Sequence, residues 1–334
     1  MRYYKVILPL IGIFIALMIG EIVVRIYYYR NMSDKTLELT DDIKLYTYKA
    51  SIEFVNRHGI KVKHNSLGLL GDEIYEKKEG TFRMLGLGDS VTAGNYLAED
   101  QRFLTVLEDV MVKKGYDVEV VNAGVGGYNT WQELDLLKNI FDIIGPDMLI
   151  VGVCLNDFVY SRPALKKGFF GSVFVNYRDG SKARHFDFLY QRSDLYKFIY
   201  DSLAAIRKKK FGDEGYKRYR DSYRLNISDG ELKRWKQPFL EIKRFAEDKN
   251  IPCLFVIFPI ESQIQRDISA SYAPLSRYFD EIGMHHMDLL PDFRERSGIP
   301  EKLYQSRDLI HPTALGHRIA GHAIAEYILE NDML

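Results

Sequence analysis

Ser90 is the residue whose setting in the sequence best suits it to covalent chemistry. It ends the motif Gly88-Asp89-Ser90, which follows the apolar run Phe82–Leu87. A serine at the carboxyl end of a buried strand is presented at the edge of the sheet, and a helical turn starting there would point its N–H into the site. Ser90 therefore meets the requirements for a nucleophile and one oxyanion donor. A serine that only caps a helix in a glycine-rich turn is the alternative.

A base for such a nucleophile occurs near the C-terminus, where Asp308 and His311 are three residues apart and directly precede Pro312. A carboxylate and an imidazole at this spacing can meet within one turn. Asp308 could then fix the tautomer of His311 while the other ring nitrogen faces the nucleophile. A capping aspartate beside a surface histidine is the alternative.

Two further motifs could bind a developing oxyanion. The segment Gly124–Thr130 contains three glycines, and glycine allows a backbone N–H to approach a ligand closely. Asn156 follows the apolar run Met148–Val153, and a side-chain amide can complete an oxyanion hole. Taken singly, both motifs are also typical of ordinary turns.

No metal ion or organic cofactor is predicted. Cys154 and Cys253 lie in apolar runs, and no Cys/His spacing of the zinc-binding kind occurs. The adjacent pair His285-His286 would point to opposite faces of a strand, which poorly suits one metal. His317 and His322 belong to the last predicted helix and are expected to be surface or capping groups.

Together, the four motifs resemble the SGNH hydrolase superfamily, also called the GDSL family. Its serine, glycine, asparagine and Asp-x-x-His blocks correspond in order to Gly88-Asp89-Ser90, Gly127, Asn156-Asp157 and Asp308-x-x-His311, over about residues 82–330. The Val62–Glu73 stretch is also similar to membrane-anchored bacterial members.

The resemblance implies a role for each matching residue. Ser90 would attack a carbonyl, His311 would take its proton, and Asp308 would orient His311. The Ser90 N–H, the Gly127 N–H and the Asn156 side chain would hold the oxyanion. One departure is visible, because Cys154 stands where the family has a glycine, so altered packing is expected near the oxyanion hole.

Alternating strands and helices should position these residues. From Phe82 onward the pattern predicts an α/β fold, a three-layer flavodoxin-like sandwich with a parallel sheet of about five strands. Ligands bind at the carboxyl ends of the strands in such folds, where the first three motifs lie. Thr130 is expected to cap one helix and Pro312 to begin the last. The predicted strands are 82–87, 118–121, 148–153, 253–258 and 285–289, and the predicted helices are 103–114, 130–141, 231–249 and 312–330.

Residues of about 160–230 interrupt the alternation and form an insertion rich in basic and aromatic residues. Between Arg162 and Arg244 there are 21 Lys/Arg against 10 Asp/Glu. We expect a helical cap near the site that shapes substrate choice. The basic run Arg207–Lys210 is either a solvated face or a contact for lipid headgroups or an acidic glycan.

The N-terminus predicts a membrane anchor. Val6–Gly20 is uncharged, and Tyr3–Val24 can span a bilayer if Glu21 lies near the interface, where Arg25 could pair with it. A cleaved signal peptide is the alternative. The expected domains are an anchor at 1–30, a linker packing on the domain at 31–80, and an SGNH hydrolase domain at 81–334 that contains the insertion.

The leading functional hypothesis is a membrane-anchored, extracytoplasmic serine esterase that hydrolyses O-acetyl groups on a cell-surface or exported polysaccharide. Alternatives are a polysaccharide O-acyltransferase, a lysophospholipase-type lipid esterase, and a non-catalytic glycan-binding protein on the same scaffold. The balance of 46 Lys+Arg against 46 Asp+Glu argues against a nucleic-acid partner. The sequence leaves the oligomeric state open.

Overall fold

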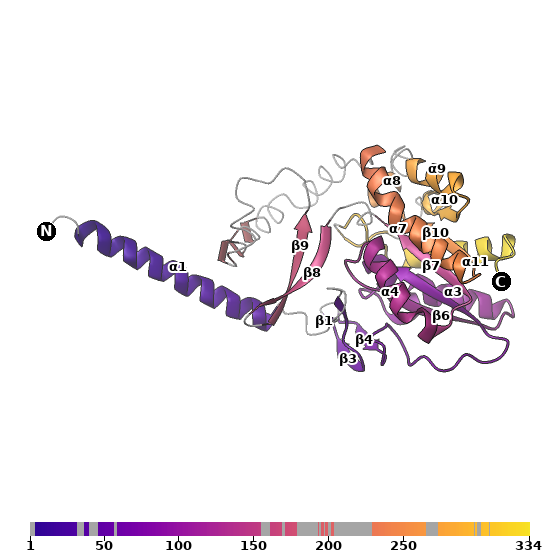
Figure 1. Cartoon of the computed structure of the whole chain (residues 1–334), viewed down its shortest axis with the longest axis horizontal. Helices are drawn as coiled ribbons and strands as arrows, with labels where there is room; N and C mark the ends of the chain where they lie inside the picture. The colour runs from indigo at the N-terminus through magenta and orange to yellow at the C-terminus, as the bar shows by residue number, and fades with distance from the viewer. Residues whose placement is uncertain are drawn as a thin grey trace.

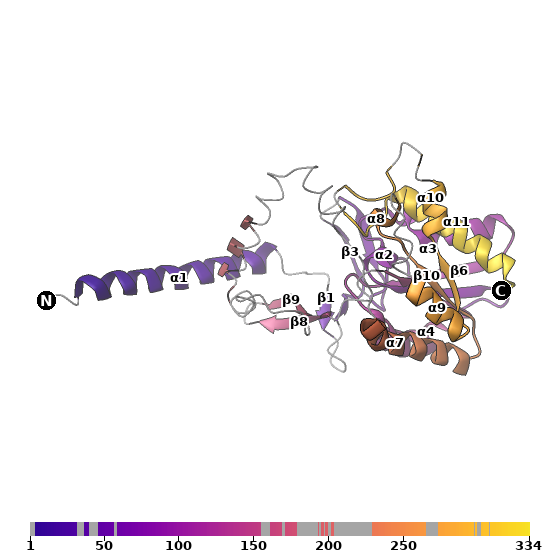
Figure 2. The same ribbon diagram turned by 90° about the horizontal axis from the view of Figure 1, so that it is seen from above.

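A layered α/β body carries one long projecting helix, α1 (Tyr4–Asn31), as both views show (Figures 1 and 2). The computed structural model describes residues 4–31, 37–39, 46–56, 59–154, 161–168, 171–178, 229–264, 273–296, 302–306 and 308–334, together with residues 193, 195, 196, 198, 199, 202, 203 and 298.

The centre of the body is a five-stranded sheet with the order β11-β10-β7-β5-β6, and all of its strand pairs are parallel. This confirms the predicted sheet. The pairing of β5 with β6 places Gly88 opposite Gly124, so the segments that follow these two strands leave the sheet side by side. The strands are β5 (Phe82–Gly88), β6 (Val118–Gly124), β7 (Met148–Val153), β10 (Cys253–Ile257) and β11 (His285–Asp288).

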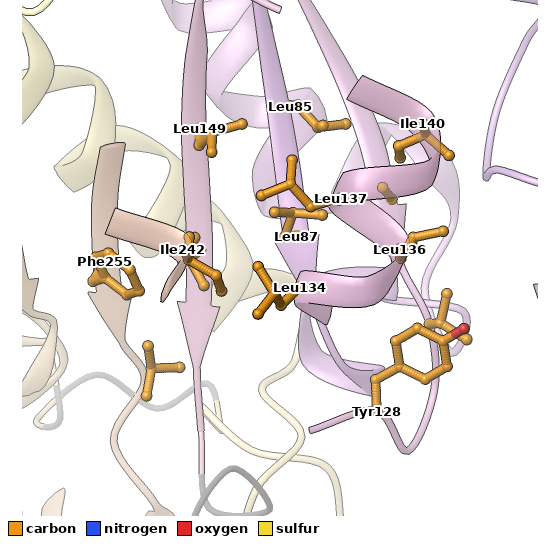
Figure 3. Packing of buried hydrophobic residues seen from close by; sticks show 14 of the residues in the cluster. Leu85, Leu87, Tyr128, Leu134, Leu136, Leu137, Ile140, Leu149, Ile242 and Phe255 are labelled. Atoms are coloured by element: carbon orange, nitrogen blue, oxygen red, sulfur yellow. The ribbon is translucent and has the colours of Figure 1, made fainter. Parts of the chain in front are cut away.

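Helices cover both faces of the sheet and complete the predicted three layers. Residues of β7 alternate between the two cores, with Leu149 in one and Ile150 in the other, because successive side chains point to opposite faces. Figure 3 shows Leu137 of α4 beside Leu87 of β5 in the first core. The first face is covered by α4 (Thr130–Ile144), α7 (Asp229–Asp248) and α9 (Ala273–Glu281), and the second by α3 (Phe103–Lys113) and α11 (Ala314–Glu330).

The roles expected of Thr130 and Pro312 at helix N-termini are wrong. Asn129, not Thr130, caps α4, because its side chain accepts from the Gln132 N–H while the Gln132 side chain accepts from the Asn129 N–H. The last helix begins at Ala314 rather than at Pro312, since Pro312 pairs in a bridge with Tyr304. The short helices are α2 (Ser90–Ala93), η1 (Glu99–Gln101), α8 (Glu261–Ile264) and α10 (Leu290–Glu295).

The segment before the sheet forms two small hairpins. β1 (Leu37–Leu39) pairs with β2 (Tyr46–Tyr48), and β3 (Ile52–Val55) pairs with β4 (Lys61–His64), both antiparallel. The predicted turn at Asn65–Gly68 is confirmed by the Gly68 N–H bond to the Asn65 carbonyl at 3.0 Å. Leu70 then bridges to Asn122 of β6, so this segment packs against the edge of the sheet.

Part of the insertion differs from the helical cap that the sequence suggested. Its first described part is an antiparallel hairpin of β8 (Ser161–Gly168) and β9 (Gly171–Arg178), which lies between α1 and the sheet (Figure 1). The run Gly171-Ser-Val-Phe-Val-Asn-Tyr is rich in β-branched and aromatic residues, which favour an extended backbone. Among the described residues of the rest of the insertion, 195–196, 198–199 and 202–203 are helical. Arg207–Lys210 lies outside the described residues.

Candidate active site

Ser90 is the first residue of α2, immediately beyond the end of β5. Asp89 caps this helix, and its Oδ1 accepts from the Val91 N–H at 2.8 Å. Gly88 has φ +152°, and a Cβ there would lie 2.0 Å from Thr92 Oγ1, so the turn requires glycine. The sharp turn presents Ser90 at the carboxyl edge of the sheet. Its N–H is in the first helical turn, where backbone donors have no intrahelical partner.

The structure brings Ser90, His311 and Asp308 into one hydrogen-bonded chain across 221 residues of sequence. Ser90 Oγ lies 2.9 Å from His311 Nε2, and His311 Nδ1 lies 2.7 Å from Asp308 Oδ2. The two ring nitrogens therefore face different partners. This arrangement can move a proton from the hydroxyl to the imidazole while the carboxylate stabilises the resulting cation.

Asp308 is fixed by backbone as well as by His311. Its Oδ1 accepts from the N–H groups of Ile310 at 2.9 Å and His311 at 3.1 Å, which leaves Oδ2 directed at the ring. Burial acts to raise the pKa of Asp308, but the hydrogen bond and charge of His311 and the two backbone donors outweigh it. The pKa of Asp308 consequently lies below its ordinary value.

A second histidine, His317, contacts the same tyrosine as His311. His317 is fully buried rather than a surface or capping group, and its Nδ1 accepts from the Phe103 N–H at 3.1 Å. Burial first, then the charges of Arg102 and His311, lower the pKa of His317 to about 3, so the ring is neutral. Its proton must then be on Nε2, which donates to the Tyr96 hydroxyl at 2.8 Å. The Tyr96 ring meets the His311 ring edge-on, with centroids 5.0 Å apart.

Tyr96 and His317 were absent from the sequence-based site. His317 lies three, four and seven residues before Ala320, Gly321 and Ile324, all of which are buried on α11. This apolar stripe is the signal that could have predicted a buried histidine. No comparable pattern marks Tyr96.

The glycine segment after β6 lies beside Ser90. A Cβ on Gly126 would be 4.0 Å from Ser90 Cβ, and Gly127 has φ +83°, a conformation that favours glycine. Asn156, the third predicted oxyanion donor, and its neighbour Asp157 lie outside the described residues.

Cys154, which stands where the family has a glycine, occupies a specific place behind the nucleophile. It is buried just after β7, and its thiol donates to Asp89 Oδ2 at 2.9 Å. The same carboxylate oxygen lies 3.4 Å from Ser90 Oγ. The substitution therefore adds a contact to the cap of α2. Among the described residues, no group of three or more His, Cys, Asp or Glu could hold a metal ion.

The chain is similar in sequence to a known esterase and to a family model. An arylesterase from Vibrio mimicus is 31% identical over 81 residues, which are 24% of this chain and 40% of the arylesterase. The chain thus matches well under two thirds of that relative's length. A family model described as GDSL-like Lipase/Acylhydrolase matches residues 84–324.

Solved structures of two other hydrolases align with the chain at low identity. The lipase/acylhydrolase from Enterococcus faecalis is 14% identical, with 75% of this chain and 96% of that chain covered and a TM-score of 0.42. A catalytic mutant of Axe2, an acetylxylan esterase from Geobacillus stearothermophilus, is 12% identical over 75% and 96% of the two chains, with a TM-score of 0.44. Since the family model spans more than half of the sequence, from β5 to α11, the chain belongs to the GDSL-like lipase/acylhydrolase family.

Proposed function

We propose that this protein hydrolyses esters through an acyl intermediate on Ser90. The observation that carries the proposal is the chain Ser90 Oγ–His311 Nε2–His311 Nδ1–Asp308 Oδ2, with steps of 2.9 and 2.7 Å. His311 accepts the Ser90 proton as the hydroxyl attacks the ester carbonyl, and then donates it to the leaving alkoxide. In the second step His311 deprotonates a water molecule that attacks the acyl carbon, and it returns this proton to Ser90 Oγ as the bond to the acyl group breaks and the acid leaves.

Three donors are proposed to hold the oxyanion that forms in each step. They are the N–H of Ser90 at the start of α2, the N–H of Gly127 after β6, and the side-chain amide of Asn156. The position of Gly126 against Ser90 supports the second of these. Preorganised donors of this kind supply much of the rate enhancement in acyl transfer.

We further propose that the substrate carries O-acetyl groups on a cell-surface or exported polysaccharide. An anchored domain outside the cytoplasm would meet such carbohydrate directly. The test is a series of p-nitrophenyl acetate, butyrate and octanoate, followed by acetate release from an O-acetylated polysaccharide. We expect the highest kcat/KM on acetate. A preference for octanoate would contradict the acetyl proposal and point to lipid esters.

We propose that α1 is a membrane anchor. We also propose that the domains divide near residues 30 and 80. Ile7–Ile26 is long and apolar enough to cross a membrane, and its side chains are almost all exposed. A signal sequence would satisfy the same description. Glu21 favours retention, because Arg25 Nε donates to its Oε1 at 2.9 Å while Ser193 Oγ and the Leu195 N–H donate to its Oε2 at 2.8 and 3.0 Å. These bonds to the insertion support the proposal that the helix is retained in the mature protein.

Retention of α1 predicts that the protein stays in the membrane fraction after alkaline carbonate extraction and that its intact mass includes residues 1–30. A variant lacking residues 2–31 is the control and should be released. A mature mass that begins after α1 would contradict the anchor.

A Lys113→Cys variant, at an exposed position, should react in spheroplasts with a membrane-impermeant maleimide if the domain is extracytoplasmic.

A further inference from the structure

Gly126, next to the proposed oxyanion donor, is held on both sides by tyrosines from a distant part of the chain. The Tyr46 hydroxyl donates to the Gly126 carbonyl at 2.9 Å. The Tyr48 hydroxyl accepts from the Gly126 N–H at 3.0 Å. Both tyrosines are on β2, about 80 residues earlier in the sequence, within the segment predicted to be a linker packing on the domain. That segment therefore reaches the active site.

The geometry of the peptide bond makes the Tyr46 contact consequential. The Gly126 carbonyl and the Gly127 N–H belong to the same peptide unit, which is planar and trans, so the two groups point in opposite directions. A hydroxyl that fixes the carbonyl on one side therefore also fixes the direction of the N–H on the other. Donation to the carbonyl polarises the peptide and strengthens its N–H as a donor.

The Tyr46 hydroxyl is itself held in place. Tyr46 and Tyr128 are both fully buried, and their rings meet edge-on with centroids 5.1 Å apart. The Tyr128 hydroxyl donates to the Tyr46 backbone carbonyl. On the other side of Gly126, the Tyr48 hydroxyl also accepts from Asn95 Nδ2 at 2.8 Å, and its ring stacks on His64. Such packing leaves the glycine peptides little freedom to turn.

We propose that Tyr46 is a positioning residue of the oxyanion hole, with Tyr48 fixing the adjoining peptide, so that the segment before the hydrolase core is part of the active site. The inference rests on the proposed function, because it assigns Tyr46 a role through the Gly127 N–H. A misdirected donor weakens binding of the tetrahedral transition state more than binding of the planar ester, so the effect belongs to kcat.

The test is Tyr46→Phe, which removes one oxygen and keeps the buried ring. We expect kcat on p-nitrophenyl acetate to fall roughly tenfold, less than the 10²–10³ lost with a direct donor, while KM stays within about twofold. The affinity for a boronic acid, which forms a tetrahedral adduct with serine, should fall by a similar factor. Tyr48→Phe is expected to give a smaller loss, about threefold, because it touches the neighbouring peptide.

Tyr278→Phe is the matched control. It also removes the hydroxyl of a buried tyrosine that donates to a backbone carbonyl, but this tyrosine is on α9 and bonds to Lys236 at 3.1 Å rather than to Gly126 or Tyr46. We expect it to lower Tm to a similar extent and leave kcat within about twofold. Equal kcat values for Tyr46→Phe, Tyr48→Phe and Tyr278→Phe, in an active wild type, would overturn this inference and leave the proposed function standing. A wild type no more active than Ser90→Ala would overturn the proposed function and the inference with it.

Discussion

Replacement of Ser90 by alanine is expected to lower kcat on p-nitrophenyl acetate by about 10⁴-fold or more. The variant loses the oxygen that forms the acyl-enzyme, while the oxyanion donors and the His311–Asp308 pair remain. Steady-state kinetics and mass spectrometry of the protein after reaction with a fluorophosphonate check this result. The wild type should gain one phosphonyl group on the peptide that contains Ser90, and the variant should gain none.

Ser66→Ala is the control, since Ser66 is an exposed serine in the turn after β4. It should keep wild-type kinetics and leave phosphonylation of Ser90 unchanged. The role of Ser90 would be contradicted if Ser90→Ala retained wild-type turnover while remaining folded. Labelling at another serine would contradict it as well.

The second large effect is expected from Asp308→Asn, which should lower kcat by roughly 10³–10⁴-fold. The introduced asparagine can still accept from the backbone N–H groups of Ile310 and His311, so the loop should hold. Its amide nitrogen, however, would donate to His311 Nδ1 where the carboxylate now accepts. The proton would then move to Nε2, the nitrogen facing Ser90, and His311 could no longer act as a base.

The pKa of Asp308 sets the pH range over which its carboxylate stabilises the folded protein. Because the folded pKa is below the ordinary value, the carboxylate stays ionised from neutral pH well into the acid range. Its contribution to stability is therefore present above the ordinary pKa and is lost as pH falls through the folded pKa. Thermal unfolding of wild type and Asp308→Asn should differ most above about pH 5 and converge as the pH falls below the ordinary aspartate pKa of about 3.9.

Asp288→Asn provides a matched control for the same chemical change. Asp288 Oδ1 also accepts from a backbone N–H two residues later, that of Leu290 at 2.9 Å, but Asp288 makes no contact with His311. Its kcat should remain within about twofold of the wild type. Comparable loss of kcat in both variants would show that the effect is general rather than due to the tautomer of His311.

Local sequence determined the scaffold and the chemical groups of the site. The apolar run Met148–Val153 forms a strand buried along its whole length, and Gly88-Asp89-Ser90 folds into the turn that presents the serine. Asp308 and His311 contact each other because three residues of spacing suffice. In each case the signal and its consequence lie within a few residues, which makes such features predictable.

Tertiary structure alone decided which residues surround the catalytic groups and the glycine segment after β6. The hydroxyls of Tyr46 and Tyr48 meet Gly126, and Tyr96 meets His317, although 78 to 221 residues separate the partners. Periodicity carries no information about such pairs, since they depend on how separate elements pack. The cap of α4 is Asn129 rather than the predicted Thr130, because the side chains of Asn129 and Gln132 bond to each other's backbone N–H. The sequence by itself thus determined which groups could react, and packing decided which distant residues hold those groups in position, because contacts between remote segments form only when the whole chain folds.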